Sequence, residues 1–441
     1  MRGSAVTAPV RRRLGPFTAV ALVVGNIIGA GIFMLPASLA PYGWNAVLAW
    51  LVTLVGAMCL AWVFAQLAAQ RADGSGTHGI VAGAFGDTAA FFTSWGYLIS
   101  VLAANAALTV AGINYLQRLL PAVGAQPWGP QAAALAMIAL FAWGNARALA
   151  GGIQVVSTLV KVSPFVIVIG LALWLLGAEG GAALTPVAAV PIEPATVFAA
   201  VGITVYAMLG LEAAAVPADA IDEPKRNVPR ATLIGTAVAG VLTLLSSSAV
   251  ALMMPQAQLA ASTAPIADFV GRFVGDGAGA FVALCAVVSC FGALNGWLLV
   301  TGELQAAMAR AGSLPRWCAR SNARGVPVNA LWLGAAVTGV FVLLAMSRGG
   351  VKAFESLALV STVTALFLYV VVTFAAGRYA RNGLLAARPS LWAAAAGALV
   401  FAAVTIWGCG PEAVLWSAGL LALGWPLRYW ARLESARGTP G

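Results

Sequence analysis

The chain has 441 residues, of which 61% are hydrophobic and only 9% are charged, and its formal net charge is +10. Soluble domains carry about 25% charged residues, so this composition excludes a soluble globular protein and predicts a polytopic membrane protein. The basic residues stand singly between apolar runs and form no arginine-rich face, which argues against nucleic acid as a partner.

Apolar stretches of about 18 or more residues predict twelve membrane-spanning helices in a lipid bilayer. They cover residues 16–39, 43–70, 86–118, 129–148, 153–177, 195–220, 231–254, 277–308, 329–346, 351–376, 390–408 and 411–430. With a cytoplasmic N-terminus, nineteen of the 24 Lys and Arg residues fall on the cytoplasmic side and four on the outer side. This bias predicts a multi-pass protein of the cytoplasmic (inner) membrane with both termini in the cytoplasm.

The first span is interrupted by glycines. Residues Val24–Phe33 read VGNIIGAGIF, with Gly25, Gly29 and Gly31 inside an apolar run. Unsatisfied backbone groups are costly in lipid, so a broken helix there needs another partner for the freed groups. A half-helix beginning near Gly31 would direct its N–H groups at an anion such as an amino-acid carboxylate. Close helix packing through small residues is the alternative interpretation.

The sixth span carries a second mid-span glycine beside a carboxylate, in the stretch Tyr206–Glu212. Spans one and six each open a set of five, residues 16–177 and 195–376, and an odd number of spans gives the two sets opposite orientations. Interrupted segments in corresponding positions of inverted halves point to the binding site of a secondary transporter. Carbonyls freed between Tyr206 and Leu209 would face a substrate ammonium group.

The predicted organisation therefore has five parts. They are a cytoplasmic tail (1–15), the first five-helix repeat (16–177), the inverted second repeat (195–376), two further helices (390–430) and a second cytoplasmic tail (431–441). The chain has no Walker-type glycine loop, which argues against an ATP-driven pump. Its five cysteines show no metal-type spacing, so we expect no metal and no cofactor.

The chain resembles the amino acid–polyamine–organocation (APC) superfamily, and within it the basic amino acid/polyamine antiporters such as the arginine/agmatine antiporter. The motifs that carry the resemblance are GNIIGAGIF at 25–33, GLE at 210–212, EPKRNVPR at 223–230 and FGALNGW at 291–297. It implies an all-α integral membrane protein of the LeuT-type fold, with 12 transmembrane helices and a 5+5 inverted repeat whose helices 1 and 6 are broken. Members of this branch form homodimers, so a homodimer is implied as well.

The resemblance also implies a substrate site. In the similar antiporters a Trp matching Trp297 stacks on the substrate guanidinium group, whereas an ordinary core or interfacial Trp is the alternative. Asn105 matches a position that binds the distal group of the substrate, and a helix–helix hydrogen bond is its alternative. Tyr97 would close the pocket, and Thr364 matches a further pocket residue. The predicted substrate-binding residues are Ile27, Gly29, Ala30, Gly31, Asn105, Tyr206, Ala207, Leu209, Trp297 and Thr364.

Two positions depart from the pattern of the arginine/agmatine antiporter. That antiporter has Trp where this chain has Tyr206, and Ser where it has Ala30. Ala30 lacks a hydroxyl that could contact the substrate carboxylate, and Tyr206 presents a smaller ring. Both changes weaken the case for arginine as the substrate.

Two ionisable residues lie deep in apolar spans, where such residues are functional candidates. Glu212 matches a gate glutamate proposed to couple pH to transport, and a structural hydrogen bond is the alternative. Lys161 matches a lysine that takes the place of Na⁺ in some APC transporters and would brace span five against the broken first span. Snorkelling of Lys161 to the membrane surface is the other interpretation. We therefore predict that Tyr97, Lys161 and Glu212 act in gating or proton coupling.

We predict a secondary active amino acid transporter that works by alternating access. The first expectation is exchange of cationic amino acids or their amines (arginine, lysine, ornithine, agmatine, putrescine), and the alternative is proton-coupled transport of neutral amino acids. A pocket without a second acidic residue fits a cationic substrate and a neutral one equally well. The spans offer no His and no Asp pair at membrane depth, so an enzyme is not expected.

Overall fold

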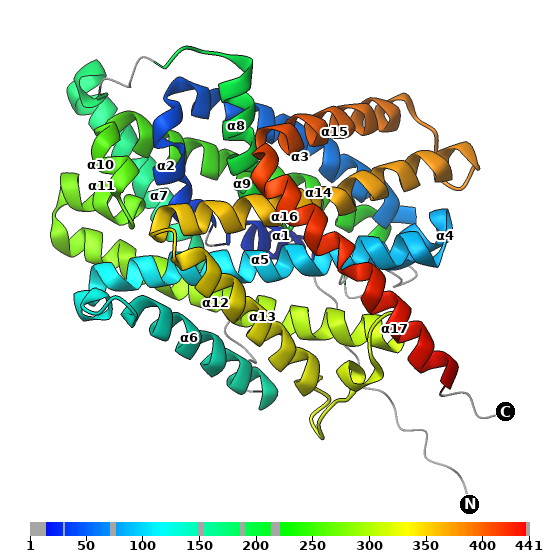
Figure 1. Cartoon of the computed structure of the whole chain (residues 1–441). Helices are drawn as coiled ribbons and strands as arrows, with labels where there is room; N and C mark the ends of the chain where they lie inside the picture. Colours follow the sequence, from blue (N-terminus) through cyan, green and yellow to red (C-terminus); the bar gives the residue numbers. More distant parts are fainter. Residues whose placement is uncertain are drawn as a thin grey trace, which may run out of the picture.

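A computed structural model describes residues 15–29, 31–70, 76–148, 154–185, 190–212 and 221–437. These residues are overwhelmingly α-helical, and long helices run from one end of the molecule to the other (Figure 1). Among the described residues, eight helices are long and apolar enough to cross a membrane, and two shorter apolar helices belong to the first and sixth predicted spans. The predicted all-α membrane protein is therefore confirmed.

The first half of the chain forms the helices of predicted spans one to five. Their bounds are α1 (Pro16–Ile27), α2 (Gly31–Leu39), α3 (Trp44–Gln70), α4 (Gly76–Phe85), α5 (Asp87–Leu119), α6 (Gly129–Ala146) and α7 (Gln154–Glu179). Short 3₁₀ turns follow α2, α5 and α7. The first span is thus divided into α1 and α2, as its glycines predicted.

The second half begins with another divided span and continues with long helices. Their bounds are α8 (Pro194–Thr204), η4 (Val205–Met208), α9 (Pro224–Met253), α10 (Gln256–Ala261), α11 (Pro265–Val274), α12 (Asp276–Arg310), η7 (Arg316–Ala319), α13 (Val328–Met346), α14 (Gly350–Arg381), α15 (Pro389–Gly408), α16 (Gly410–Ala422) and α17 (Gly424–Arg437). The sequence did not predict α10 and α11, which lie in the connection between spans seven and eight. These two short helices mark one end of the molecule, on the left of Figure 1, and α4 marks the opposite end.

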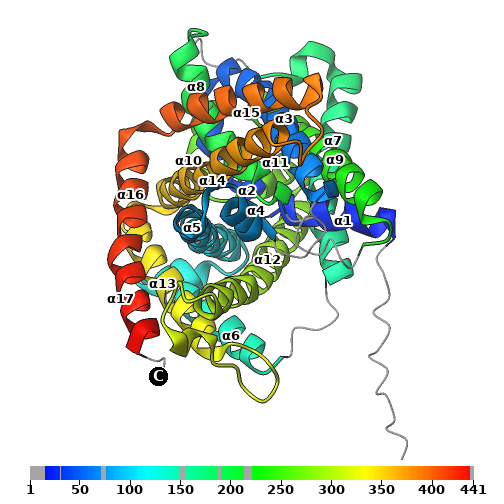
Figure 2. The same ribbon diagram turned by 90° about the vertical axis from the view of Figure 1, so that its right-hand side faces the viewer.

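The twelfth predicted span forms two helices, α16 and α17, which continue one another along one side of the molecule (Figure 2). The interruption has a cause in α5. The indole Nε1 of Trp95 donates a hydrogen bond to the carbonyl oxygen of Leu420 at 3.0 Å. In a continuous helix that oxygen would accept from the N–H of Gly424, so the inserted indole competes with the helical ladder.

Helix α5 forms the centre of the bundle and packs most closely against α14 and α12 (Figure 2). The most apolar 18-residue window of α5 is 89% buried. Ala103, Ala106, Ala107 and Ala111 are fully buried on it. Small residues let neighbouring backbones approach closely, which is how helices pack in a membrane, where lipid tails are as apolar as leucine.

Candidate substrate-binding site

The first break lies at the end of α1. Ile28 leaves the helical conformation (φ −72°, ψ 73°), and the N–H of Gly29 bonds to the carbonyl oxygen of Ile27 at 2.7 Å in a tight turn. Helix α2 begins at Gly31. The prediction for Ala30 falls outside the described residues.

The second break follows α8. The chain tightens into the 3₁₀ turn η4, becomes extended at Leu209 and takes a positive φ of 98° at Gly210. A Cβ atom at Gly210 would lie 3.2 Å from the carbonyl oxygen of Asn26. Both the left-handed conformation and this close approach favour glycine. The two breaks therefore meet directly.

A cavity lies between the two breaks and helices α5, α12 and α14. Its lining residues are Asn26, Ile27, Gly29, Tyr97, Ser100, Val101, Ala104, Leu108, Tyr206, Ala207, Leu209, Gly210, Glu212, Trp297, Ala365 and Tyr369. Its volume is about 60 Å³, whereas a water molecule takes about 30 Å³ of liquid and ligand pockets usually exceed about 300 Å³. The walls of this cavity must therefore move apart to admit an amino acid or a diamine.

Two tyrosines hold the acidic side chain of the cavity. Tyr97 Oη donates to Glu212 Oε1 at 2.9 Å, and Tyr369 Oη donates to Glu212 Oε2 at 2.6 Å. The Glu212 side chain is buried, and among the described residues it makes no ion pair. Both carboxylate oxygens of Glu212 therefore accept a hydrogen bond from a tyrosine.

Aromatic rings form much of the remaining wall. Tyr206 Oη donates to the carbonyl oxygen of Ala104 at 3.3 Å, and the Tyr206 ring meets Phe354 edge to face at 5.5 Å between centroids. Trp297 is half-buried and lines the cavity from α12. With the rings of Tyr97 and Tyr369, the wall offers four aromatic side chains around one carboxylate.

Two predicted binding residues point elsewhere in this structure. Asn105 is buried, and its Nδ2 donates to Thr301 Oγ1 at 3.0 Å, which is the helix–helix hydrogen bond of the alternative interpretation. Thr364 Oγ1 donates to the carbonyl oxygen of Val360 at 2.8 Å. Their neighbours Ala104 and Ala365 line the cavity instead, because one residue along an α-helix turns the side chain by about 100°. Gly31, a third predicted residue, is the first residue of α2.

Several lining residues were not predicted. Those on α5 follow Tyr97 at helical spacing: Ser100, Val101, Ala104 and Leu108. This stripe could have been found by continuing the helical period from Tyr97. Tyr369 lies one turn after Ala365 on α14, and no local pattern distinguishes it from the chain's other tyrosines.

Lys161 lies behind the first break, outside the cavity. Its Nζ donates to the carbonyl oxygen of Gly25 at 3.3 Å, and the side chain is buried. Gly25 belongs to the last turn of α1, where carbonyl groups lack helical partners and a cation is favourable. The contact joins α7 to the broken span, as the resemblance implied, and it argues against snorkelling to the membrane surface.

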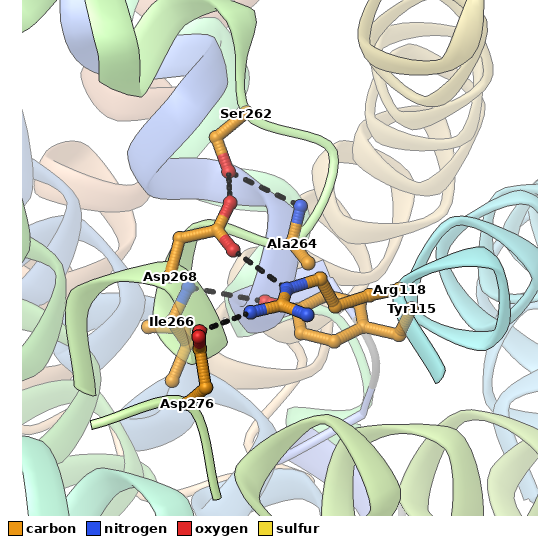
Figure 3. Close-up of polar contacts among 7 residues, drawn as sticks. All are labelled: Tyr115, Arg118, Ser262, Ala264, Ile266, Asp268 and Asp276. Carbon is orange, nitrogen blue, oxygen red and sulfur yellow. Dashed lines mark hydrogen bonds and ion pairs between the residues drawn. The ribbon is translucent and has the colours of Figure 1, made fainter. Parts of the chain in front are cut away.

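The end of the molecule that carries α11 is tied together by buried hydrogen bonds (Figure 3). Tyr115 Oη of α5 donates to the carbonyl oxygen of Phe33 in α2 at 2.9 Å. The same hydroxyl accepts from the N–H of Ile266 in α11 at 3.2 Å. The side chain of Tyr115 thus connects α2, α5 and α11.

Arginine–carboxylate pairs add to this connection (Figure 3). Arg118 Nε lies 3.2 Å from Asp268 Oδ1, and Arg118 Nη2 lies 3.1 Å from Asp276 Oδ1. The other oxygen of Asp268 accepts from Ser262 Oγ at 2.6 Å. Arg118 therefore joins the end of α5 to both α11 and the start of α12.

The sequence of this chain is similar to those of known transport proteins. A family profile described as amino acid permease matches residues 14–429. The chain is 28% identical over 423 residues to the putrescine transporter PotE of Escherichia coli (strain K12). These aligned residues cover 94% of this chain and 95% of that protein. It is 27% identical over 430 residues to PotE of Haemophilus influenzae, covering 94% and 96%. It is 28% identical over 350 residues to the cadaverine/lysine antiporter of E. coli (strain K12), covering 77% of each.

Proposed function

Since the chain belongs to the amino acid permease family, we propose that it is a secondary transporter that exchanges cationic amino acids and their amines across a membrane by alternating access. The similar proteins are named for putrescine, cadaverine and lysine. These three molecules share ammonium groups on a flexible alkyl chain. The family consists of transporters, so the chain is a transporter and not an enzyme.

The observation that carries this proposal is the charge of the cavity. Among the described residues, its lining includes one acidic side chain, Glu212, and no basic one. The rings of Tyr97, Tyr206, Trp297 and Tyr369 lie around it. A cation near an aromatic face gains about 0.5–2 kcal/mol, and more when water is excluded. The cavity therefore favours a positively charged amine.

An amino acid brings a carboxylate as well, and the first break offers a partner for it. Helix α2 begins at Gly31, two residues after Gly29 of the cavity wall. The free N–H groups and positive dipole end of a helix N-terminus favour an anion. In this assignment the substrate carboxylate faces α2 and its side-chain amine faces the aromatic wall. Putrescine and cadaverine, which have no carboxylate, would use the wall alone.

The same proposal includes the placement of the chain. We infer that it lies in the cytoplasmic membrane with the α4 end and both termini toward the cytoplasm, on the bias of Lys and Arg toward that side. Residues 16–177 and 195–376 would be the inverted repeats, since their broken spans occupy corresponding positions. Proton coupling through Glu212 and a homodimer remain predictions.

The test is exchange by the purified chain in proteoliposomes. Vesicles preloaded with unlabelled putrescine or lysine are compared with empty vesicles for uptake of radiolabelled putrescine, lysine, arginine and leucine. The proposal expects uptake of the cationic substrates into preloaded vesicles only, at rates well above those of protein-free vesicles. Uptake of leucine alone, driven by a proton gradient, would contradict it and support the neutral amino acid alternative.

A matched pair of variants ties the transport to the cavity. Trp297→Leu should reduce exchange of the cationic substrates, because it removes an aromatic face from the wall. Trp332→Leu should not, since Trp332 is exposed on α13 away from the cavity. Equal activity of the two variants would show that Trp297 does not contribute to the substrate-binding site.

A further inference from the structure

A groove outside the substrate site lies at the α4 end of the molecule, between α4, α14 and α15. These three helices come together on the right-hand side of Figure 1. The volume of the groove is about 1010 Å³. Among the described residues, it shares no lining residue with the substrate cavity.

Two arginines stand at one end of the groove. Arg378 and Arg381 are exposed in the last turn of α14, three residues apart and so on the same side of the helix. The Arg378 Cζ atom lies 5.7 Å from the ring centre of Phe85, and the Arg381 Cζ atom lies 5.9 Å from the ring centre of Trp392. Within the described part of the chain neither arginine forms an ion pair. Two guanidinium groups are thus held in place by rings and lack an anion.

Apart from Thr373 and Asn382, the rest of the groove is apolar. Phe374, one turn before Arg378, is exposed toward it, and Ala396 and Leu399 form the opposite wall on α15. These residues belong to helices that cross the membrane, so this wall faces hydrocarbon. Trp392 lies beside the arginines, and tryptophan is favoured where membrane meets water. The groove therefore joins a pair of cations at the membrane surface to an apolar channel in its interior.

We propose that this groove binds an anionic phospholipid. Its phosphate accepts hydrogen bonds from Arg378 and Arg381, whose planar guanidinium groups suit phosphate oxygens, and one acyl chain lies between Phe374 and Leu399. Basic pockets between membrane helices on the cytoplasmic side recognise anionic headgroups in this way. The negative end of the α14 dipole opposes an anion only weakly, because it amounts to about half a charge against two full ones.

A second copy of this chain is a less suitable occupant. A twofold-symmetric contact places the same surface of both copies together. Both Arg378–Arg381 pairs would then be buried in one interface, and among the described residues the groove lining supplies no carboxylate to pair with them. An anionic lipid instead supplies the missing charge, and the surrounding bilayer supplies the lipid.

The test is native mass spectrometry of the full-length purified chain with added lipid. Palmitoyl-oleoyl phosphatidylglycerol is compared with phosphatidylcholine of the same acyl chains. We expect tighter binding of phosphatidylglycerol to the wild type. The double variant Arg378→Gln, Arg381→Gln should weaken that binding about tenfold or more and leave phosphatidylcholine unchanged. The control Arg320→Gln, Arg432→Gln removes two other exposed arginines predicted to lie on the same side and should keep the preference.

A second pair of variants tests the acyl channel without changing charge. Ala396→Trp fills the groove and should reduce phosphatidylglycerol binding, whereas Ala393→Trp, exposed on α15 outside the groove, should not. Equal binding of the two lipids, or equal binding by wild type and the Arg378/Arg381 variant, would overturn the proposal. A dimer that Ala396→Trp dissociates would overturn it in favour of a second copy. None of these readouts depends on transport.

Discussion

Glu212 has both carboxylate oxygens occupied, by Tyr97 of α5 and Tyr369 of α14. Three separate parts of the chain therefore meet at one carboxylate beside the second break. Protonation of Glu212 would turn one oxygen into a donor and would weaken the hydrogen bond that this oxygen accepts from its tyrosine. A proton on Glu212 is thus expected to loosen the contact between the second break and the scaffold helices. The sequence analysis selected Glu212 and Tyr97 as candidate residues but not Tyr369.

The first prediction concerns the charge of Glu212. Glu212→Gln keeps the shape of the side chain and removes the negative charge from the cavity. We expect the apparent affinity for putrescine to fall about tenfold or more, because a cation in a cavity of low dielectric loses its counter-charge. The affinity is measured as exchange in proteoliposomes over a range of putrescine concentrations.

The control for this change is Glu303→Gln. Glu303 is a half-exposed carboxylate of α12 that lies 4.0 Å from Arg310 and does not line the cavity. Its loss should leave the affinity for putrescine unchanged. If Glu212→Gln kept the wild-type affinity, Glu212 would be a structural residue only.

At the scale of elements, the broken first span is fastened at two places by different neighbours. Lys161 of α7 holds the end of α1 through Gly25, and Tyr115 of α5 holds α2 through Phe33. Each half of the span therefore has its own attachment, and each can be released without the other. Such separate attachments suit a transporter, which must open toward one side of the membrane at a time.

The second prediction concerns the attachment of α1. Lys161→Met keeps a long apolar stem but leaves the Gly25 carbonyl without its donor. We expect the rate of exchange to fall about tenfold, because losing a hydrogen bond to a charged group costs about 1.5–3 kcal/mol. Substrate affinity should change less, since Lys161 does not line the cavity. Lys225→Met, on the exposed start of α9, is the matched control. A loss of affinity at an unchanged rate would contradict the bracing role.

The third prediction concerns the attachment of α2. Tyr115→Phe removes the hydroxyl that donates to Phe33 and accepts from Ile266. We expect α2 and α11 to separate more readily and the cavity to open more often at the α11 end. The measure is the rate at which a cysteine placed at Leu108 reacts with a membrane-impermeant thiol reagent. Leu108 lines the cavity and is 4% exposed in this structure. Tyr429→Phe, exposed on α17, should leave the reaction rate unchanged.

The ion pairs of Arg118 with Asp268 and Asp276 also hold the α11 end together, but their strength depends on the salt concentration. Their side chains are partly or largely exposed, so each pair stabilises the closed form by about 1 kcal/mol or less. High ionic strength should therefore increase the reaction rate at the same cysteine modestly in the wild type. In Arg118→Gln that increase should disappear. A larger effect of Arg118→Gln than of Tyr115→Phe would show that the ion pairs, not the buried hydroxyl, hold this end closed.

At the scale of the whole molecule, patterns that repeat along the chain predicted the fold well. Hydrophobic runs gave the helices, and the glycines of Val24–Phe33 and Tyr206–Glu212 located both breaks. The rotation of each helix about its axis was harder to predict from the sequence, because it is set by packing against other helices. Asn105 and Thr364 are therefore each one position from the cavity wall. The break between α16 and α17 depends on Trp95, 325 residues from its partner Leu420, and no local pattern contains that information.

The orientation of the whole molecule gives the last prediction. The bias of Lys and Arg places the α4 end in the cytoplasm and the α11 end outside. Ser347, between α13 and α14, and Asn382, between α14 and α15, are both exposed and lie at opposite ends of α14. In intact cells an impermeant maleimide should label Ser347→Cys and spare Asn382→Cys. The native cysteines are buried or half-buried, which keeps the background low.

Permeabilised cells supply the control, since both variants should then be labelled equally. Labelling of Asn382→Cys alone in intact cells would show that the molecule has the opposite orientation in the membrane. The groove with Arg378 and Arg381 would then face the outer leaflet, and Tyr115 would close the cytoplasmic side of the cavity. Because nineteen basic residues would have to lie outside in that arrangement, against four inside, we expect the first result. It would assign the Tyr115 contacts to the outer gate and the arginine groove to the cytoplasmic leaflet.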